Sequence, residues 1–361
     1  MKPVNTALCS FGMSGWVFHA PFIATNPHFN LYAVWERSKN LAEEKYPGVI
    51  TYRTLEEMLA DAAIELVIVN TPNYTHYEYT KKALLAGKHV VVEKPFTATV
   101  KEAGELIELA KKQNKKLSVY QNRRYDSDYK TIKKILDEKL LGDLVEAEFH
   151  FDRYSENISP KAHKEIPGPG TGTLYDLGSH LIDQALQLFG MPESIFADIR
   201  IVRPISKVDD YFDLLLYYPK LRVRIKSSYQ VREPLPGYIL HGSKGSFIKP
   251  KTNIQEILLQ AGEVPGTADW GIESESERGL LHTEKNARLN DEVGQGDVIR
   301  EYIQSEKGNY GDYYNAMYEA IRNDKPVPVS AEDGLNVIKI IEAAFKSSNE
   351  KKVVEIHSKH Q

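Results

Sequence analysis

A lysine, Lys94, stands directly after the apolar run Val-Val-Val-Glu at positions 90–93 and is followed by a proline. If the run is a strand of a parallel sheet, Lys94 lies at its carboxyl end, where ligands of such sheets bind. Its ammonium group could exchange a proton with a substrate hydroxyl or stabilise developing negative charge there. The simpler alternative is a strand-end ion pair between Lys94 and Glu93.

A second set of candidate residues lies in the segment LYDLGSHLIDQALQLF at 174–189, where Asp176, His180 and Asp183 are spaced by four and three. A helix would present them on one face. A hydrogen bond donated by the His180 imidazole to the Asp176 carboxylate would fix the tautomer of His180 as a general base. Ordinary helix-surface contacts and an Asp/His/Asp metal site are the alternatives. Gly178 disfavours the surface alternative, since glycine inside a helix costs about 1 kcal/mol and indicates a close approach.

A third motif is a glycine-containing turn after the first apolar run. The residues predicted to bind cofactor phosphates there are Ser10, Phe11, Gly12, Met13, Ser14 and Gly15. The dinucleotide fingerprint Gly-x-Gly-x-x-Gly uses its second glycine for close backbone approach to pyrophosphate and its third for helix–strand packing. The chain keeps these two glycines and has Ser10 in place of the first. The amides and positive dipole of the following helix N-terminus would complete the phosphate site.

The end of the second apolar run, Trp35-Glu36-Arg37-Ser38, supports a dinucleotide site. Glu36 comes 21 residues after Gly15, about where an acidic residue meets the adenosine ribose. Arg37 and Ser38 beside it suit a 2′-phosphate. The cofactor is therefore expected to be NADP or NAD, with Arg37 favouring NADP. The alternative is that Glu36 and Arg37 are solvated loop charges.

Other strand ends should meet at the same edge of the sheet and face the cofactor. The residues that we predict to bind it there are Thr71, Pro72, Asn73, His76, Glu93, Lys94 and Asn122. His76 could equally begin a helix without a chemical role. A metal is not predicted, because hydride transfer to a nicotinamide needs none and Lys94 supplies positive charge.

The elements that would position these residues follow from a strand–helix rhythm over the first 120 residues. Runs rich in Val, Ile and Leu at 4–11, 29–35, 64–70, 89–92 and 117–120 alternate with helical segments. Such runs are typical of strands buried on both faces, and the alternation predicts a parallel doubly wound sheet. We predict a Rossmann domain for residues 1–123.

The pattern changes after about residue 125, and residues 124–361 are predicted to form a second, α+β domain for substrate binding and oligomerisation. Strand candidates occur at 144–151, 195–202, 211–218, 222–231, 238–241 and 246–249. The run Arg222-Val-Arg-Ile-Lys alternates charged and apolar residues, which is typical of an antiparallel sheet with one solvated face. A second subunit is a plausible cover for that open sheet.

The overall composition excludes several classes of protein. The chain has 361 residues, 42% hydrophobic and 27% charged, with a net charge of -4, so nucleic acid is not an expected partner. Its one cysteine, Cys9, lies in an apolar run and is expected to be a buried thiol. Apolar stretches are too short for a membrane span, and the first ten residues are not expected to form a secretory signal. A cytoplasmic location is expected.

Taken together, GMSGWVFHAP, EKPF, NRRYDSD and GTGTLYDLGSHLIDQALQLFG resemble the glucose–fructose oxidoreductase/inositol dehydrogenase (Gfo/Idh/MocA) family, in particular bacterial NADP-dependent scyllo-inositol dehydrogenases. The resemblance implies a Rossmann domain and an α/β domain whose large, mostly antiparallel sheet supports homodimers or homotetramers. It also implies that Lys94 lies at the nicotinamide and substrate, that Asp176 and His180 are the acid–base pair, and that Asp183 touches substrate hydroxyls.

The expected activity is oxidation of a secondary hydroxyl of a cyclic polyol or sugar, or reduction of the matching ketone. Arg123, Arg153 and Tyr154 are candidate specificity residues beside Asp183. The alternative is a non-catalytic sensor that binds NAD(P) and regulates a partner, although such a protein would be expected to lose Lys94 or His180, and both are present.

Overall fold

The computed structural model describes residues 2–161, 164–285 and 298–356, and the chain divides into two compact units. Unit 1 comprises Met1–Asn122, Gln255–Trp270 and Asn309–Ile338, and unit 2 comprises Arg123–Ile254, Gly271–Gly308 and Lys339–Gln361. The sequence-based division assigned everything after residue 123 to one domain. Two later segments instead pack with unit 1, through contacts between residues far apart in the chain that no local pattern reveals.

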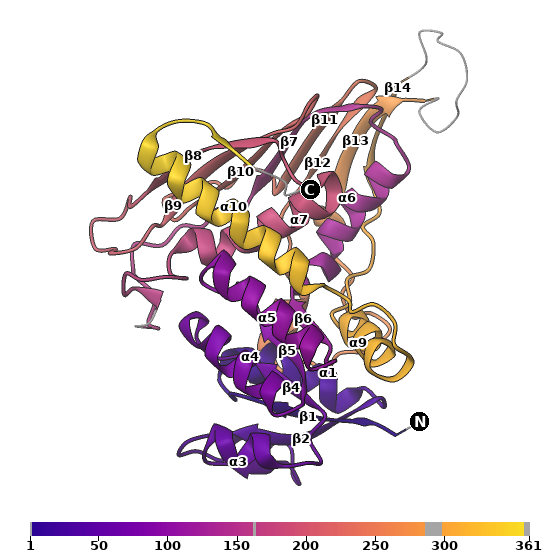
Figure 1. Ribbon diagram of the computed structural model, residues 1–361. Helices are drawn as coiled ribbons and strands as arrows, with labels where there is room; N and C mark the ends of the chain where they lie inside the picture. Colours follow the sequence, from indigo (N-terminus) through magenta and orange to yellow (C-terminus); the bar gives the residue numbers. More distant parts are fainter. Residues whose placement is uncertain (1, 162–163, 286–297, 357–361) are drawn as a thin grey trace. The chain divides into compact units, whose positions relative to one another are not determined.

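The described part of unit 1 contains a six-stranded parallel sheet in the order β3-β2-β1-β4-β5-β6 (Figure 1). Its strands are β1 (Val4–Leu8), β2 (Phe29–Trp35), β3 (Ile50–Tyr52), β4 (Leu66–Val69), β5 (His89–Glu93) and β6 (Leu117–Tyr120). Every residue of β4 and β6 is buried, as a sheet covered on both faces requires. The predicted Rossmann-type sheet is therefore confirmed. Cys9, just after β1, is 2% exposed, and burial raises the pKa of its thiol.

Helical segments alternate with the strands of unit 1: the π-helical segment η1 (Ser14–His19), α1 (Ala20–Thr25), α2 (Leu41–Lys45), α3 (Leu55–Ala60), the 3₁₀ segment η2 (Asn73–Thr75), α4 (His76–Leu85) and α5 (Val100–Lys112). The later chain segments of the unit add most of α8 (Ile254–Gln260), α9 (Gly311–Asn323) and the first part of α10 (Ala331–Glu350). Helices α4 and α5 pack against each other, and α1 packs against β2 and α9. The sequence did not predict α2 or β3, which are too short to show a period.

The described part of unit 2 forms a nine-stranded sheet in the order β14-β13-β12-β11-β7-β10-β9-β8-β15. Its strands are β7 (Leu144–His150), β8 (Ser194–Arg200), β9 (Tyr211–Tyr217), β10 (Arg222–Ser228), β11 (Tyr238–Gly242), β12 (Gly245–Lys249), β13 (Gly279–Glu284), β14 (Val298–Ile303) and β15 (Val354–Glu355). Only β7 and β10 pair in parallel among these neighbours. The predicted mostly antiparallel sheet is confirmed.

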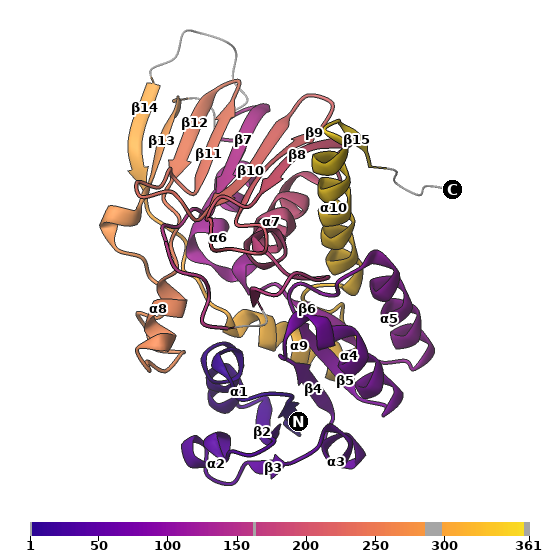
Figure 2. The same cartoon turned by 90° about the vertical axis from the view of Figure 1, so that its left-hand side faces the viewer.

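One face of this sheet is covered by helices. Figure 2 shows α6 (Ser127–Asp137), α7 (Ser179–Phe189) and α10 on the same side of the strands. Residues of β9 alternate between buried and half-buried, because successive side chains point to opposite faces. Within the described ranges, no helix has the length and apolar character that a membrane span needs.

Candidate active site

The turn after β1 keeps a tight conformation although Ser10 replaces a glycine. The Ser10 hydroxyl accepts a hydrogen bond from the Gly12 amide at 3.1 Å, and the Asn70 side-chain amide donates to the Ser10 carbonyl at 2.8 Å. A Cβ on Gly15 would lie 2.3 Å from that same carbonyl oxygen. Gly15 therefore permits the close helix–strand packing that the fingerprint needs, and Ser10 ties the turn together with its side chain.

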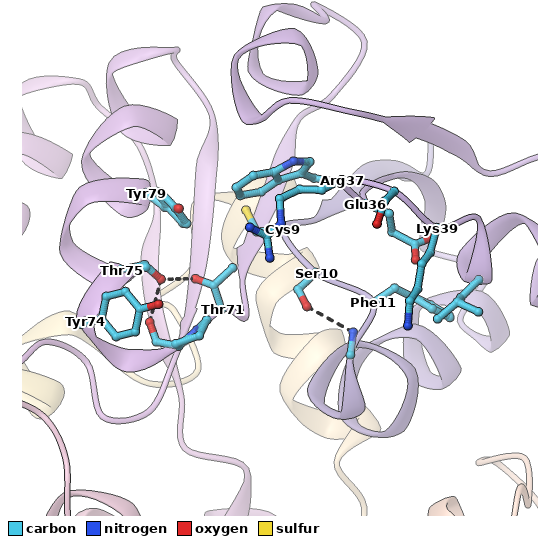
Figure 3. A pocket seen from close by; sticks show the side chains of 15 residues that line it. Cys9, Ser10, Phe11, Glu36, Arg37, Lys39, Thr71, Tyr74, Thr75 and Tyr79 are labelled. Atoms are coloured by element: carbon cyan, nitrogen blue, oxygen red, sulfur yellow. Dashed lines mark hydrogen bonds between the residues drawn. The ribbon is translucent and has the colours of Figure 1, made fainter. Parts of the chain in front are cut away.

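A cavity of about 470 Å³ adjoins this turn (Figure 3). Its lining residues come from the turn, from the end of β2 and the segments after β2 and β4, and from α2 and α4. They are Cys9, Ser10, Phe11, Gly12, Trp35, Glu36, Arg37, Ser38, Lys39, Leu41, Thr71, Pro72, Tyr74, Thr75 and Tyr79. In Figure 3, Thr71 and Tyr74 lie on one side of Ser10 and Glu36 and Lys39 on the other. The structure thus brings the predicted turn together with Glu36, Arg37, Ser38, Thr71 and Pro72.

Hydrogen bonds to α2 and from Arg53 fix the loop after β2. Glu36 is 8% exposed, and its carboxylate accepts a hydrogen bond from the Ala42 amide at the start of α2, at 3.0 Å. Arg53 donates to the Glu36 and Lys39 carbonyls at 3.0 and 2.6 Å. Arg37, Ser38 and Lys39 are exposed. The carboxylate is therefore partly engaged by α2, while two cations and a hydroxyl line the cavity.

These residues fit a bound dinucleotide. In the part of the chain that the structure describes, Asn70 Oδ1 and Gln121 Oε1 are buried acceptors without a hydrogen-bond partner. They stand at the ends of β4 and β6, at the edge where ligands of parallel sheets bind. A buried acceptor without a donor is costly, and the hydroxyl and carboxamide groups of a dinucleotide are donors. Together with the Gly15 turn and the adjoining cavity, they match a Rossmann cofactor site.

The Lys94 strand end is joined to the turn by Glu93. The Ser14 hydroxyl donates to Glu93 Oε1 at 2.6 Å, and His19 Nε2 lies 3.0 Å from the same oxygen. The Lys94 amide donates to the other oxygen, Oε2, at 3.2 Å. Burial by itself would raise the pKa of Glu93, but the His19 and Ser14 hydrogen bonds and the Lys94 charge bring it below its ordinary value. Glu93 is thus an ionised carboxylate that links the two motifs.

His76 is fully buried at the start of α4. Its Nδ1 lies 2.8 Å from the Pro95 carbonyl oxygen and its Nε2 lies 2.9 Å from the Thr71 carbonyl oxygen. Burial lowers the pKa of this imidazole. His76 therefore connects the end of β4 to the segment after β5, and a contact between His76 and the cofactor stays a prediction.

In unit 2, Asp176 lies in a π-helical segment, η5 (Leu174–Gly178), and His180 follows it in α7. His180 is 5% exposed, which argues against ordinary helix-surface contacts. Asp176 accepts a hydrogen bond from Lys164 Nζ at 2.7 Å, and the Asp176 charge raises the pKa of Lys164. The hydrogen bond expected between Asp176 and His180 stays a prediction.

Packing and backbone conformation explain why Gly172 and Gly178, near the start of η5 and α7, are glycines. A Cβ on Gly178 would lie 2.7 Å from Leu174 Cδ1 and 3.3 Å from the Phe212 ring, so the close approach inferred from sequence is packing against β9. Gly172, at φ +94°, has a backbone conformation that favours glycine, and a Cβ there would overlap the Asp209 carboxylate. Asp209 in turn accepts a hydrogen bond from the Leu174 amide at 2.8 Å and fixes the start of the helix.

Replacing Asp209 by asparagine should change how stability depends on pH. Burial raises the pKa of Asp209 to about 6 from 3.8, so folding favours its protonated form. The folded state then binds more protons than the unfolded state between about pH 4 and 6, and this contribution to stability is lost as pH rises through that window. Asp209→Asn keeps an acceptor for the Leu174 amide and cannot ionise. As the pH rises from 4 to 7, we expect the unfolding free energy of Asp209→Asn to increase by about 1–3 kcal/mol relative to that of the parent protein.

Urea-induced unfolding of the full-length chain at several pH values measures this difference. Asp198→Asn, at an exposed acid on β8, is the control and should follow the parental pH profile. A constant difference between Asp209→Asn and the parent across pH 4–7 would show that Asp209 does not titrate in this range.

The predicted substrate residues fall into two groups. Arg123 and Asp183 are buried: Arg123 donates to Asp126 and Asn253 at 3.1 and 2.8 Å, and Asp183 forms a bidentate ion pair with Arg124 at 2.8 and 2.6 Å. Arg153 and Tyr154 are exposed. The Tyr154 hydroxyl donates to Glu156 and accepts from Arg232. No group of three or more His, Cys, Asp or Glu side chains among the described residues could hold a metal ion.

Several residues of these sites were not predicted from the sequence. They are Trp35, Lys39, Arg53, Tyr74, Thr75 and Tyr79 around the cavity, His19 and Gln121 near Lys94, and Lys164 beside Asp176. Lys39, Trp35, Tyr74, Thr75 and Gln121 adjoin predicted residues along the chain, and that adjacency was a usable signal. Arg53, Tyr79, His19 and Lys164 reach the sites from other segments, so spacing along the chain does not reveal them.

Known proteins match this chain along nearly all of its length. The oxidoreductase-family profile for an NAD-binding Rossmann fold matches residues 4–121, and the profile for its C-terminal α/β domain matches residues 133–356. The chain is 39% identical to scyllo-inositol 2-dehydrogenase (NADP(+)) IolW of Bacillus subtilis, over 97% of this chain and 95% of that protein.

Solved structures agree. A Bacteroides fragilis oxidoreductase is 49% identical with a TM-score of 0.88, covering 98% of this chain and 100% of that one. The oxidoreductase YvaA of Bacillus subtilis is 39% identical with a TM-score of 0.93, covering 98% of each chain.

Proposed function

This chain belongs to the Gfo/Idh/MocA family of oxidoreductases, and on that premise we propose that it transfers hydride between NADP and a secondary hydroxyl or ketone of a cyclic polyol or sugar. It is an NAD(P)-dependent dehydrogenase that acts on CH–OH groups. The substrate class is inferred from the scyllo-inositol dehydrogenase relative, which is similar along 97% of the chain.

The observation that carries the proposal is the order of the strand ends in unit 1. β1, β4 and β5 are neighbours in the sheet, and their carboxyl ends carry the phosphate-binding turn, Thr71 and Lys94. Because parallel strands end at one edge, these groups line the same side of the unit. The hydrogen bond from Ser14 to Glu93 connects the first of these ends to the third. A lysine beside a cofactor turn is the arrangement that a hydride-transfer reaction at a C–O bond needs.

We assign one role to each of three side chains. His180 takes the proton of the substrate hydroxyl, and Asp176 orients its imidazole. Lys94 donates a hydrogen bond to the reacting oxygen and stabilises the charge that develops there. A nicotinamide bound at this edge would supply the hydride-transfer chemistry. Lys164 donates a hydrogen bond to the Asp176 carboxylate and so helps to fix its position.

The preference for NADP is part of the proposal. Glu36, the acid that would otherwise favour an unphosphorylated ribose, bonds the start of α2, whereas Arg37, Ser38 and Lys39 are exposed at the cavity. Two cations and a hydroxyl suit the 2′-phosphate of NADP. Arg53 supports the arrangement, because it holds two carbonyls of the same loop.

Replacing Arg37 by methionine should weaken NADP binding selectively. The loss of one charge-assisted contact of about 1.5–3 kcal/mol corresponds to roughly a 10- to 100-fold higher KM for NADP+. The KM for NAD+ should stay within about twofold, because NAD+ lacks the 2′-phosphate. Lys112→Met, at an exposed cation at the end of α5, is the matched control and should change neither constant. Equal losses for both cofactors in Arg37→Met would argue against 2′-phosphate recognition.

A panel of inositols, other cyclic polyols and sugars, assayed with NADP+ and NAD+ at 340 nm, tests the activity itself. We expect reduction of NADP+ with at least one cyclic polyol or sugar. Tight NADPH binding without absorbance change across the panel in either direction would instead favour the regulatory or sensor alternative.

We further propose a homodimer or homotetramer formed through the unit 2 sheet, and a cytoplasmic location. The alternating burial of β9 and β10 supports the oligomer, since the sheet face away from α7 is more exposed in a single subunit. The proposed location rests on the composition of the sequence.

A further inference from the structure

The buried imidazole of His19 contacts Glu93, the residue directly before Lys94. His19 is fully buried, with Nε2 3.0 Å from Glu93 Oε1 and Nδ1 2.6 Å from the Tyr314 hydroxyl. The Tyr120 ring packs against the imidazole, with ring centroids 4.4 Å apart. Tyr314 belongs to α9, so this contact joins the first and last chain segments of unit 1. Both ring nitrogens therefore have polar protein partners.

The π-helical segment η1 explains why His19 reaches this position. In a regular α-helix, residues five apart point about 140° away from each other. In a π-helix the backbone hydrogen bonds run from i to i+5, and the wider turn brings such residues near one another. Ser14 and His19 are five apart, and both contact Glu93 Oε1. The wide turn thus lets one short segment bind a single carboxylate oxygen twice.

Three hydrogen-bonding groups fix the position of the Glu93 carboxylate. One carboxylate oxygen is held by Ser14 and His19, and the other accepts the Lys94 amide. The pKa of Glu93 is lowered, so the group is ionised, and only 13% of its side chain is exposed. A largely shielded carboxylate that loses a donor is costly and tends to move towards water. Without His19, the Ser14 hydroxyl would be the remaining donor to Glu93 Oε1. Its position, and with it the spacing between the turn and Lys94, would no longer be fixed.

We propose that His19 is a positioning residue for this dehydrogenase: it fixes Glu93 so that the phosphate-binding turn and Lys94 keep the spacing that hydride transfer needs. The assignment rests on the proposed function, because it gives Lys94 a role at the reacting oxygen. His19 is fully buried, so it acts through Glu93 and not on a ligand. Tyr314 supports it from the side of α9 by fixing the ring.

Two substitutions at His19 and one at Tyr314 test the proposal. His19→Leu removes the donor to Glu93, and we expect kcat to fall roughly 10- to 100-fold, as small displacements of reacting groups do. The dissociation constant of NADPH, read from its fluorescence, should also rise, because Ser14 in the turn shares the Glu93 oxygen. His19→Gln keeps an N–H donor and should restore most of both quantities. Tyr314→Phe keeps the ring and should show a smaller loss in the same direction.

A purely structural histidine would behave differently. His89→Gln is the control: His89 begins β5 at the opposite end from Lys94, and its Nδ1 accepts the Lys116 amide at 3.0 Å. This variant should change the melting temperature alone. Parental kcat and NADPH affinity in folded His19→Leu would overturn the proposal, as would equal losses in His19→Leu and His19→Gln. If His19→Leu does not fold, Tyr314→Phe decides: weaker NADPH binding with lower kcat supports the proposal, and parental values overturn it.

The NADPH measurement separates this proposal from the proposed function. A parent protein that binds NADPH but turns over no polyol or sugar would contradict the substrate class. The effect of His19 on NADPH affinity would still be measured in the same protein.

Discussion

Replacing His180 by asparagine or Lys94 by methionine is expected to lower kcat by about 10²–10⁴-fold, the range typical of a lost general acid–base group. His180 takes the hydroxyl proton and Lys94 stabilises the reacting oxygen, so each acts mainly in the transition state. Neither substitution touches the turn or the cavity that binds adenosine. The dissociation constant of NADPH should therefore stay within about threefold of the parental value, since cofactor binding is not the step affected.

Steady-state kinetics with the best substrate of the panel, together with NADPH fluorescence, measures both quantities. His241→Asn is a matched control in unit 2, because His241 is partly exposed on β11 and bonds the Ser246 hydroxyl. Lys101→Met, at an exposed lysine of α5, serves unit 1. Full activity in either His180→Asn or Lys94→Met would remove that residue from the mechanism.

The second large effect is expected at the two glycines of the turn, which should respond differently to alanine. A Cβ at Gly15 would lie 2.3 Å from the Ser10 carbonyl oxygen, so Gly15→Ala must open the turn. We expect it to destabilise the free protein by about 1–3 kcal/mol and to weaken NADPH binding by about 10- to 100-fold. A Cβ at Gly12 meets only the Ser10 hydroxyl, at an ordinary 3.5 Å. Gly12→Ala should leave the stability of the free protein nearly unchanged and still weaken NADPH binding, because backbone approach to pyrophosphate is blocked.

Thermal unfolding without cofactor and NADPH titration distinguish the two variants. Gly104→Ala in α5 is the control, since a Cβ there meets nothing within 4 Å, and it should leave NADPH affinity unchanged. Parental NADPH affinity in Gly12→Ala would mean that the pyrophosphate does not approach this turn.

Much of the fold could be predicted because its signals are local. The strands β4, β5 and β6 are largely apolar runs without alternation, and the alternation of charged and apolar residues in β10 indicates a sheet with one solvated face. The packing of α9 with unit 1 could not be predicted, because it depends on contacts between residues nearly two hundred or more positions apart, such as the hydrogen bond from Tyr313 to Ser118. Periodicity along the chain carries no such information.

The site shows the same limit at the level of single side chains. The spacing from Gly15 placed Glu36 near the ribose, but its carboxylate bonds the first turn of α2, a five-residue helix that periodicity does not reveal. The spacing of Asp176 and His180 was read as an α-helical pair, whereas Asp176 lies in a π-helical segment. Lys164 lies outside the helical segment that carries Asp176, and only the folded chain brings it to Asp176.

The way unit 1 is assembled has a consequence for biosynthesis. Its three segments end at residues 122, 270 and 338, and α9 supplies Tyr314 to His19. A nascent chain grows from its N-terminus, and domains generally fold as units. The dinucleotide-binding unit cannot reach its final packing until the ribosome has passed residue 338, after nearly all of unit 2 has been synthesised. Cofactor-binding competence should thus arise late in translation, and a fragment that stops at residue 123 would present the ribosome-associated chaperones with an unfinished core.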